Sequence, residues 1–225
     1  MADRQAKALV VRGGWEGHEP VGTTDRVMPL LVEAGFQVDI SGSIAIYADA
    51  EAMEDIDLIV QCWTMGEITP DQLKGLLSTV SSGAGLTGWH GGLCDAFRNA
   101  PEYQFMTGGQ WVAHPGGKLE YEVNFLDPQD TGPLMAGLED FRLRSEQYYM
   151  HVDPSNHVLA TTTFPGTDDA PWTKGCVMPV AWTRTYGEGK VFYSALGHDV
   201  ADFDIPQVPE LIVRGSLWAS RTAPG

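Results

Sequence analysis

The chain has 225 residues, 43% of them hydrophobic, and its 30 acidic against 14 basic residues give a formal net charge of −16. This length and apolar content suit a single α/β domain spanning residues 1–225. The negative charge repels phosphate backbones and anionic membranes, so neither nucleic acid nor a membrane is an expected partner, and a neutral or cationic ligand is favoured.

Strands and helices alternate in the first half of the chain. Helical stripes of apolar side chains occupy residues 27–34 and 73–80, and the second begins at a capping sequence, Thr69-Pro70-Asp71-Gln72. Short apolar runs, which predict buried strands, lie between them at residues 7–11, 36–40, 57–61 and 85–89. This alternation predicts a doubly wound, mostly parallel sheet with helices on both faces and ligands at the carboxyl ends of its strands.

The middle of the chain, residues 101–175, is rich in Gly, Pro and Asp and is expected to be an irregular elaboration of the same domain, with candidate strands at residues 118–125 and 157–163. The regular pattern then returns. Strands are predicted at residues 179–183 and 190–195, joined by a hairpin-like turn at 186–189, and a last helix at 209–219.

The cysteines and the N-terminus indicate the compartment. Three cysteines, without a C-x-x-C pair, suggest neither a disulfide framework nor a cysteine-rich zinc site. The first apolar segment, residues 8–11, is too short for a signal sequence or a membrane span. We therefore expect a cytoplasmic protein.

Two histidines directly follow predicted strands. Gly88-Trp89-His90-Gly91-Gly92 has the spacing of a nucleophile elbow with His90 in the nucleophile's position. His198 follows the strand at 190–195, so the two imidazoles can converge if both strands are parallel. The plainer alternatives are a hydrogen-bonded His90 in a tight turn and a surface His198 paired with Asp199.

Other polar residues extend this group. His18 lies in the loop after the first strand, and His114 and Glu146 lie in the middle segment. Imidazole and carboxylate groups suit Zn²⁺ or Mn²⁺, although no H-x-x-x-H spacing brings two ligands together locally. We take His90, His198 and Glu146 as catalytic residues and candidate metal ligands. The rival account needs no ion, with His90 as base and His198 as acid.

Six motifs in a fixed order support a family resemblance. They are Gly17-His18-Glu19, residues 85–92, residues 103–109 with His114-Pro115, residues 146–149, residues 179–184 and residues 189–199. Together they resemble the ThuA-like (trehalose-utilisation) family over nearly the whole chain. The resemblance implies a glutamine amidotransferase-like, flavodoxin-like fold, a role in disaccharide catabolism and a functional link to a dehydrogenase that oxidises sugars at carbon 3. It does not imply amidotransfer, because His90 replaces the nucleophilic cysteine.

The leading hypothesis is an isomerase, lyase or hydrolase that moves protons on a sugar or 3-keto-sugar, with or without a divalent metal. A non-catalytic carbohydrate-binding or partner-docking module is the alternative, and a hydrolase that uses Cys94 is the third. Nothing indicates a nucleotide cofactor, and the oligomeric state, including a homo-oligomer, stays open. The candidate substrate-binding residues are His18, Trp15, Trp63, Trp89, His114 and Asp199.

Overall fold

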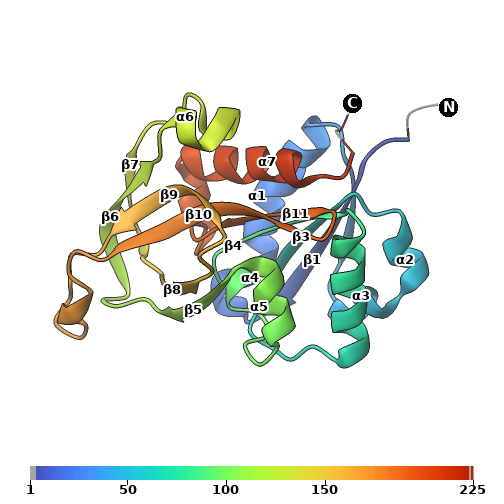
Figure 1. Ribbon diagram of the computed structural model, residues 1–225, viewed down its shortest axis with the longest axis horizontal. Coiled ribbons are helices and arrows are strands. Elements are labelled where there is room, and N and C mark those ends of the chain that lie inside the picture. The colour runs from blue at the N-terminus through green and yellow to red at the C-terminus, as the bar shows by residue number, and fades with distance from the viewer. Residues whose placement is uncertain (1–3, 223, 225) are drawn as a thin grey trace.

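A computed structural model describes residues 4–222 and 224. One half of its large sheet is parallel and has the strand order β2-β1-β3-β4-β11 (Figure 1). The central strands β1, β3, β4 and β11 are mostly apolar and buried between two layers of helices, as parallel strands usually are, whereas β2 is a more exposed edge strand. Their bounds are β1 (Lys7–Gly14), β2 (Gln37–Ser41), β3 (Leu58–Thr64), β4 (Gly85–Trp89) and β11 (Gly189–Ser194).

The other half of the sheet is antiparallel and continues from β11 in the order β10-β9-β6-β7. A separate two-stranded ribbon, β5 with β8, lies below it in Figure 1. The bounds are β5 (Gly109–Ala113), β6 (Lys118–Phe125), β7 (Phe141–Glu146), β8 (Tyr149–Val152), β9 (His157–Thr163) and β10 (Val177–Tyr186).

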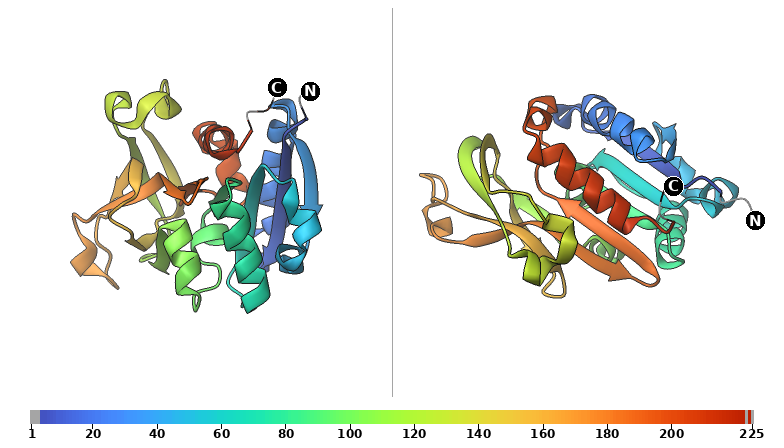
Figure 2. Two further views of the ribbon diagram at one scale, coloured as in Figure 1. Left: turned by 45° about the vertical axis from the view of Figure 1, so that its right-hand side comes forward. Right: turned by 90° about the horizontal axis from the view of Figure 1, so that it is seen from above.

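Helices cover both faces of the parallel half, with α1 and α7 together on one face and α3, α4 and α5 on the other (Figure 2). In the described residues, no helix is long and apolar enough to span a membrane. The helices are α1 (Pro20–Glu33), α2 (Ala50–Glu54), α3 (Pro70–Ser81), α4 (Gly91–Cys94), α5 (Pro101–Thr107), α6 (Pro128–Thr131) and α7 (Gln207–Ala219). The 3₁₀ turns are η1 (Glu16–His18), η2 (Ile44–Ala48), η3 (Gly132–Met135), η4 (Pro171–Thr173) and η5 (Val200–Asp204).

The predicted α/β fold class is confirmed, and several elements match closely. β4, β6 and β9 have the predicted bounds. The predicted capping box starts α3, because the Thr69 hydroxyl accepts from the Gln72 amide while the Gln72 side chain accepts from the Thr69 amide. Local apolar runs and capping residues were therefore sufficient for these elements.

Residues 101–175 are more regular than predicted. They form α5, α6, two 3₁₀ turns and five strands, of which β6, β7 and β9 extend the main sheet. The missed strand β7 alternates buried Phe141, Leu143 and Ser145 with exposed Arg142 and Arg144. This is the period-two pattern of a strand with one covered face, in a segment too short to stand out among Gly and Pro.

Candidate functional site

The elbow after β4 places His90 at the carboxyl edge of the sheet. His90 has φ 46° and ψ −138°, a conformation that residues other than glycine rarely adopt. The next residue, Gly91, leaves room for the ring of His18, because a Cβ at Gly91 would lie 2.5 Å from that ring. The strained turn thus presents the imidazole of His90 beyond the end of its strand.

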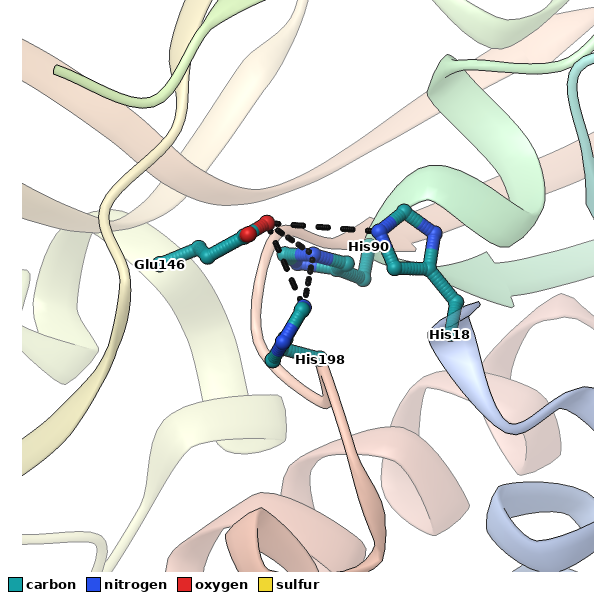
Figure 3. Close-up of side chains that lie close together, drawn as sticks. All are labelled: His18, His90, Glu146 and His198. Carbon is teal, nitrogen blue, oxygen red and sulfur yellow. Dashed lines mark hydrogen bonds and ion pairs between the residues drawn. The ribbon is translucent and has the colours of Figure 1, made fainter. Parts of the chain in front are cut away.

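Four side chains from distant parts of the chain converge at this edge (Figure 3). His18 comes from η1, His90 follows β4, Glu146 ends β7 and His198 follows β11. One ligand atom from each lies within 4.8 Å of all the others. We call these four residues the histidine–glutamate cluster.

The distances within the cluster are short. Glu146 Oε2 lies 3.2 Å from His90 Nε2, 3.2 Å from His198 Nδ1 and 3.9 Å from His18 Nε2. His90 Nε2 and His198 Nδ1 are also 3.2 Å apart. The structure thus brings the predicted trio of His90, His198 and Glu146 together, and it adds His18, a predicted substrate-binding residue, to the same cluster.

Hydrogen bonds outside the cluster orient two of its rings. His90 Nδ1 lies 2.9 Å from the Ala195 carbonyl, which can only accept, so Nδ1 carries a hydrogen and, in the neutral ring, Nε2 directs its lone pair at the cluster. His18 Nδ1 hydrogen-bonds to the Thr64 hydroxyl at 2.9 Å, which leaves Nε2 to face Glu146. Such outer partners are typical of histidines that bind metals.

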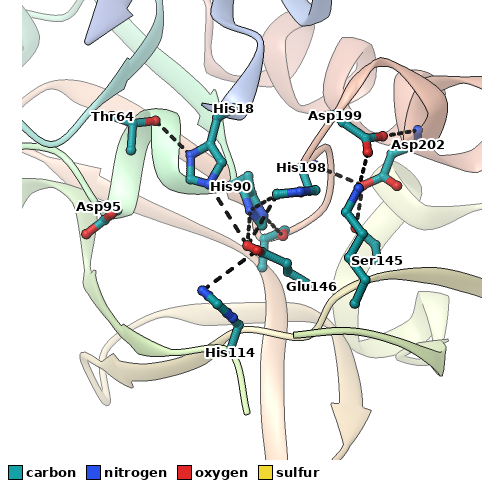
Figure 4. Close-up of polar contacts among 12 residues, drawn as sticks. His18, Thr64, His90, Asp95, His114, Ser145, Glu146, His198, Asp199 and Asp202 are labelled. Atoms are coloured by element: carbon teal, nitrogen blue, oxygen red, sulfur yellow. Dashed lines mark hydrogen bonds and ion pairs between the residues drawn. The ribbon is translucent and has the colours of Figure 1, made fainter. Parts of the chain in front are cut away.

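A carboxylate ties the loop of His198 to the strand that carries Glu146 (Figure 4). Asp202 Oδ2 accepts from the His198 amide at 2.8 Å and from the Ser145 hydroxyl at 2.7 Å. Ser145 directly precedes Glu146. Asp202, which sequence reasoning missed, therefore sets the spacing between two members of the cluster.

Tyr148 is a second residue that sequence reasoning missed. Its ring stacks on His90 with centroids 3.8 Å apart and is 3% exposed. The motif at 146–149 contains Tyr148, but no local signal in the sequence says which of its two tyrosines faces His90. The stacked ring fixes the plane of the imidazole.

Burial and neighbouring charges set the protonation of the cluster. Burial, followed by the nearby His90 and His198, lowers the pKa of His18 to about 3, and burial also lowers the pKa of His90. Burial by itself raises the pKa of Glu146, but the contacts with His198 and His90 outweigh it and leave the pKa below its ordinary value. Burial thus disfavours a positive charge on His18 and His90, and the contacts with His198 and His90 favour the ionised form of Glu146.

His114 and Trp15 lie beside the cluster, and Trp63 lies near the carboxyl end of the neighbouring strand β3. His114 Nε2 is 3.7 Å from Glu146 Oε1, and its side chain is 40% exposed. Trp15 is exposed and packs edge-on against His18, with ring centroids 4.7 Å apart. Trp63, half-buried, lies next to Gly13 and close to the end of β3. These residues remain open to the substrate roles assigned to them.

Trp89 and Asp199 do not fit the substrate-binding roles predicted for them. Trp89 is 1% exposed and packs against Phe203, because it is the last residue of β4 and belongs to the core. Asp199 pairs with Lys118 and caps η5 by accepting from the amides of Ala201 and Asp202. Its carboxylate is therefore used within the protein.

Cys94 does not have the properties of a nucleophile. It ends α4, is 1% exposed, and burial raises the pKa of its thiol well above the ordinary value. A reactive cysteine requires the opposite shift. The cysteine-dependent hydrolase is disfavoured on this ground.

Solved structures share the fold. A ThuA-like protein of Bacteroides uniformis superposes with a TM-score of 0.78 at 18% identity, over 97% of this chain and 93% of that one. A ThuA-like protein of Parabacteroides merdae gives 0.76 at 20% identity, over 96% and 90%. A β-galactosidase of Bacillus circulans gives 0.56 at 18% identity and covers 94% of this chain, which corresponds to 31% of the enzyme.

None of the curated proteins matches the sequence significantly. The model of the ThuA family, described as trehalose utilisation, matches residues 7–219. These residues include every strand and helix of the structure and all four members of the cluster. The fold is consistent with the glutamine amidotransferase-like fold expected from the sequence. The chain therefore belongs to the ThuA family.

Proposed function

We propose that this protein is a divalent-metal-dependent enzyme of disaccharide catabolism that acts on a sugar or 3-keto-sugar. The observation that supports it is the lone pair of His90 Nε2, which points at the carboxylate of Glu146 from 3.2 Å. Two acceptors at this distance repel unless they share a cation, either a proton or a metal ion. The metal ion accounts for all four convergent side chains, whereas one proton serves a single pair.

The spacing of the cluster fits a small divalent ion. With zinc–ligand bonds of about 2.0 to 2.1 Å in a tetrahedral arrangement, neighbouring ligand atoms lie about 3.3 Å apart. Three separations among His90, His198 and Glu146 are 3.2 Å, and that from His18 to Glu146 is 3.9 Å. Three neutral nitrogens and one carboxylate oxygen also form an ordinary ligand set for Zn²⁺ or Mn²⁺.

Such an ion, when bound, would polarise a carbonyl or hydroxyl oxygen of the sugar and make the neighbouring C–H or O–H more acidic. Within the chain, His114 is the group suited to moving that proton. Its ring is 40% exposed, its Nε2 lies 3.7 Å from Glu146 Oε1, and histidine is the side chain that most often serves as a general acid or base. Tyr148 and the Ala195 carbonyl hold the ring of His90 in place.

The experiment combines elemental analysis with a screen of 3-keto-disaccharides and their parent sugars. We expect about one equivalent of divalent metal in the purified protein, and activity that chelation removes and Zn²⁺ or Mn²⁺ restores. His90→Ala and Glu146→Gln should lose both metal and activity. His151→Ala, which removes an exposed histidine of β8 outside the cluster, is the matched control and should lose neither.

Two results would count against the proposal. Well under one equivalent of metal, with activity undiminished after exhaustive chelation, would leave acid–base catalysis by His90 and His198 as the mechanism. Sugar binding that survives His90→Ala, in a protein without turnover on any sugar of the screen, would instead indicate a non-catalytic carbohydrate-binding module.

A further inference from the structure

A cavity of about 490 Å³ lies between β5 and the segment that contains η4. Its walls include three aromatic side chains, Trp111, Tyr149 and Trp172, together with His114 and Asp169. The volume lies within the range of small-molecule sites, about 300 to 1,000 Å³. The chemistry proposed above involves His114 and gives no role to the rest of this space.

The cavity and the histidine–glutamate cluster share a wall. His114 lines the cavity, and its Nε2 lies 3.7 Å from Glu146 Oε1. Trp111 also lines the cavity, with its ring 6.1 Å from that of Tyr148, which stacks on His90. The cavity therefore adjoins the cluster, and a ligand longer than one sugar ring can reach it past His114 and Trp111.

The aromatic walls differ in how firmly they are held. Trp172 is 79% exposed on the single turn of η4, an unusual place for a large apolar ring. Trp111, in contrast, is half-buried under the guanidinium of Arg98, which lies 4.8 Å above its ring and is held by Asp95. One fixed ring and one exposed ring form a surface on which a flat ligand can stack.

The polar groups of the cavity suit a hydroxylated ligand. Asp169 is exposed at the wall, and its carboxylate accepts a long bond of 3.4 Å from the Gly116 amide. A carboxylate of this kind can accept hydrogen bonds from hydroxyl groups. An anionic ligand would meet this charge and the net charge of −16, so a neutral one is favoured.

We propose that the cavity is a second-sugar subsite, which holds the outer pyranose ring of a disaccharide or glycoside while the reacting ring lies at the cluster. The placement of the reacting ring rests on the proposed function. The outer ring stacks its C–H face on Trp172 and directs hydroxyl groups to Asp169. A monosaccharide occupies only the position at the cluster and does not contact Trp172 or Asp169.

Calorimetric titration of the full chain, loaded with Zn²⁺, against trehalose and glucose tests the subsite. We expect trehalose to bind about tenfold more tightly than glucose, as the burial of one ring face implies. Trp172→Ala should reduce that ratio to near one without changing zinc content, and Trp172→Phe should restore part of it. Phe105→Ala, which removes a ring that is 66% exposed on α5 and away from the cavity, should keep the full ratio.

Two outcomes would overturn the subsite. Either wild-type protein binds trehalose no more tightly than glucose, or Trp172→Ala retains the full preference. The zinc content of Glu146→Gln tests the metal-dependent function separately from the subsite, which depends on Trp172. If the zinc test fails while the preference for trehalose still depends on Trp172, the proposed function is wrong and the subsite stands.

Discussion

A methyl group added at Gly91 should displace a proposed metal ligand without disturbing the fold. In Gly91→Ala, the new Cβ would lie 2.5 Å from both Cε1 and Nδ1 of His18, and 3.1 Å from Thr64 Cγ2. Carbon atoms in contact are about 3.5 Å apart at the closest, so the ring of His18 must move by about 1 Å. Gly91 is the first residue of α4 and does not have a left-handed conformation, so alanine carries no backbone strain there.

The expected loss of zinc affinity follows from how little metal–ligand distances can vary. Ligand distances in such sites hold to about 0.2 Å, so a shift of about 1 Å removes His18 as a ligand. His90, His198 and Glu146 would still bind the ion. We expect zinc affinity to fall by at least about 10- to 100-fold, or about 1.4 to 2.7 kcal/mol, which is the loss typical of removing only an outer partner of a ligand. Apo-protein stability should stay level or rise, because alanine favours a helix by about 0.5 to 1 kcal/mol over glycine.

Competition with a chromophoric chelator measures the zinc affinity of each variant. Gly42→Ala is the control, because an added Cβ there meets nothing within 4 Å. The double variant Gly91→Ala/His18→Ala should bind zinc as weakly as His18→Ala alone, since both changes remove the same ligand. Wild-type affinity in Gly91→Ala, or additive losses in the double variant, would refute this reasoning.

Three further predictions concern stability, thiol reactivity and ligand charge. Asp57→Asn should lower the free energy of unfolding by about 1 to 3 kcal/mol, because the buried carboxylate accepts bonds from the Lys7 amide and the Arg4 side chain. Burial alone raises the pKa of Asp57, but these bonds bring it below its ordinary value, so the stabilisation is complete above about pH 4 and is lost as pH falls through the folded-state pKa. Urea titrations across that range check this, and an equal pH dependence in both proteins would contradict it. Alkylation should modify the half-exposed Cys176 before the buried Cys94, and peptide mapping that shows the reverse order would revive a cysteine mechanism. Sugar phosphates should compete less well than the matching free sugars because the chain carries a net charge of −16, and stronger competition by the phosphates would rule this out.

The sequence by itself determined the parallel half of the fold and one edge of the site. β4 and α3 could be predicted from a continuous apolar run and a capping box, because both signals depend on neighbouring residues alone. The elbow at His90 and the strand before His198 also placed two imidazoles at one edge, since parallel strands end on the same side of a sheet.

Only the tertiary structure decided which other residues reach that edge. Glu146 was a candidate by residue type, but its place at the cluster depends on the pairing of β7 with β6, where it lies opposite Lys118. The directions of two aromatic rings could not be predicted either. The ring of Trp89 is buried in the core, and the ring of Tyr148 stacks on His90. Strand register and the direction of a side chain arise from contacts between distant segments, and a local sequence pattern does not specify such contacts.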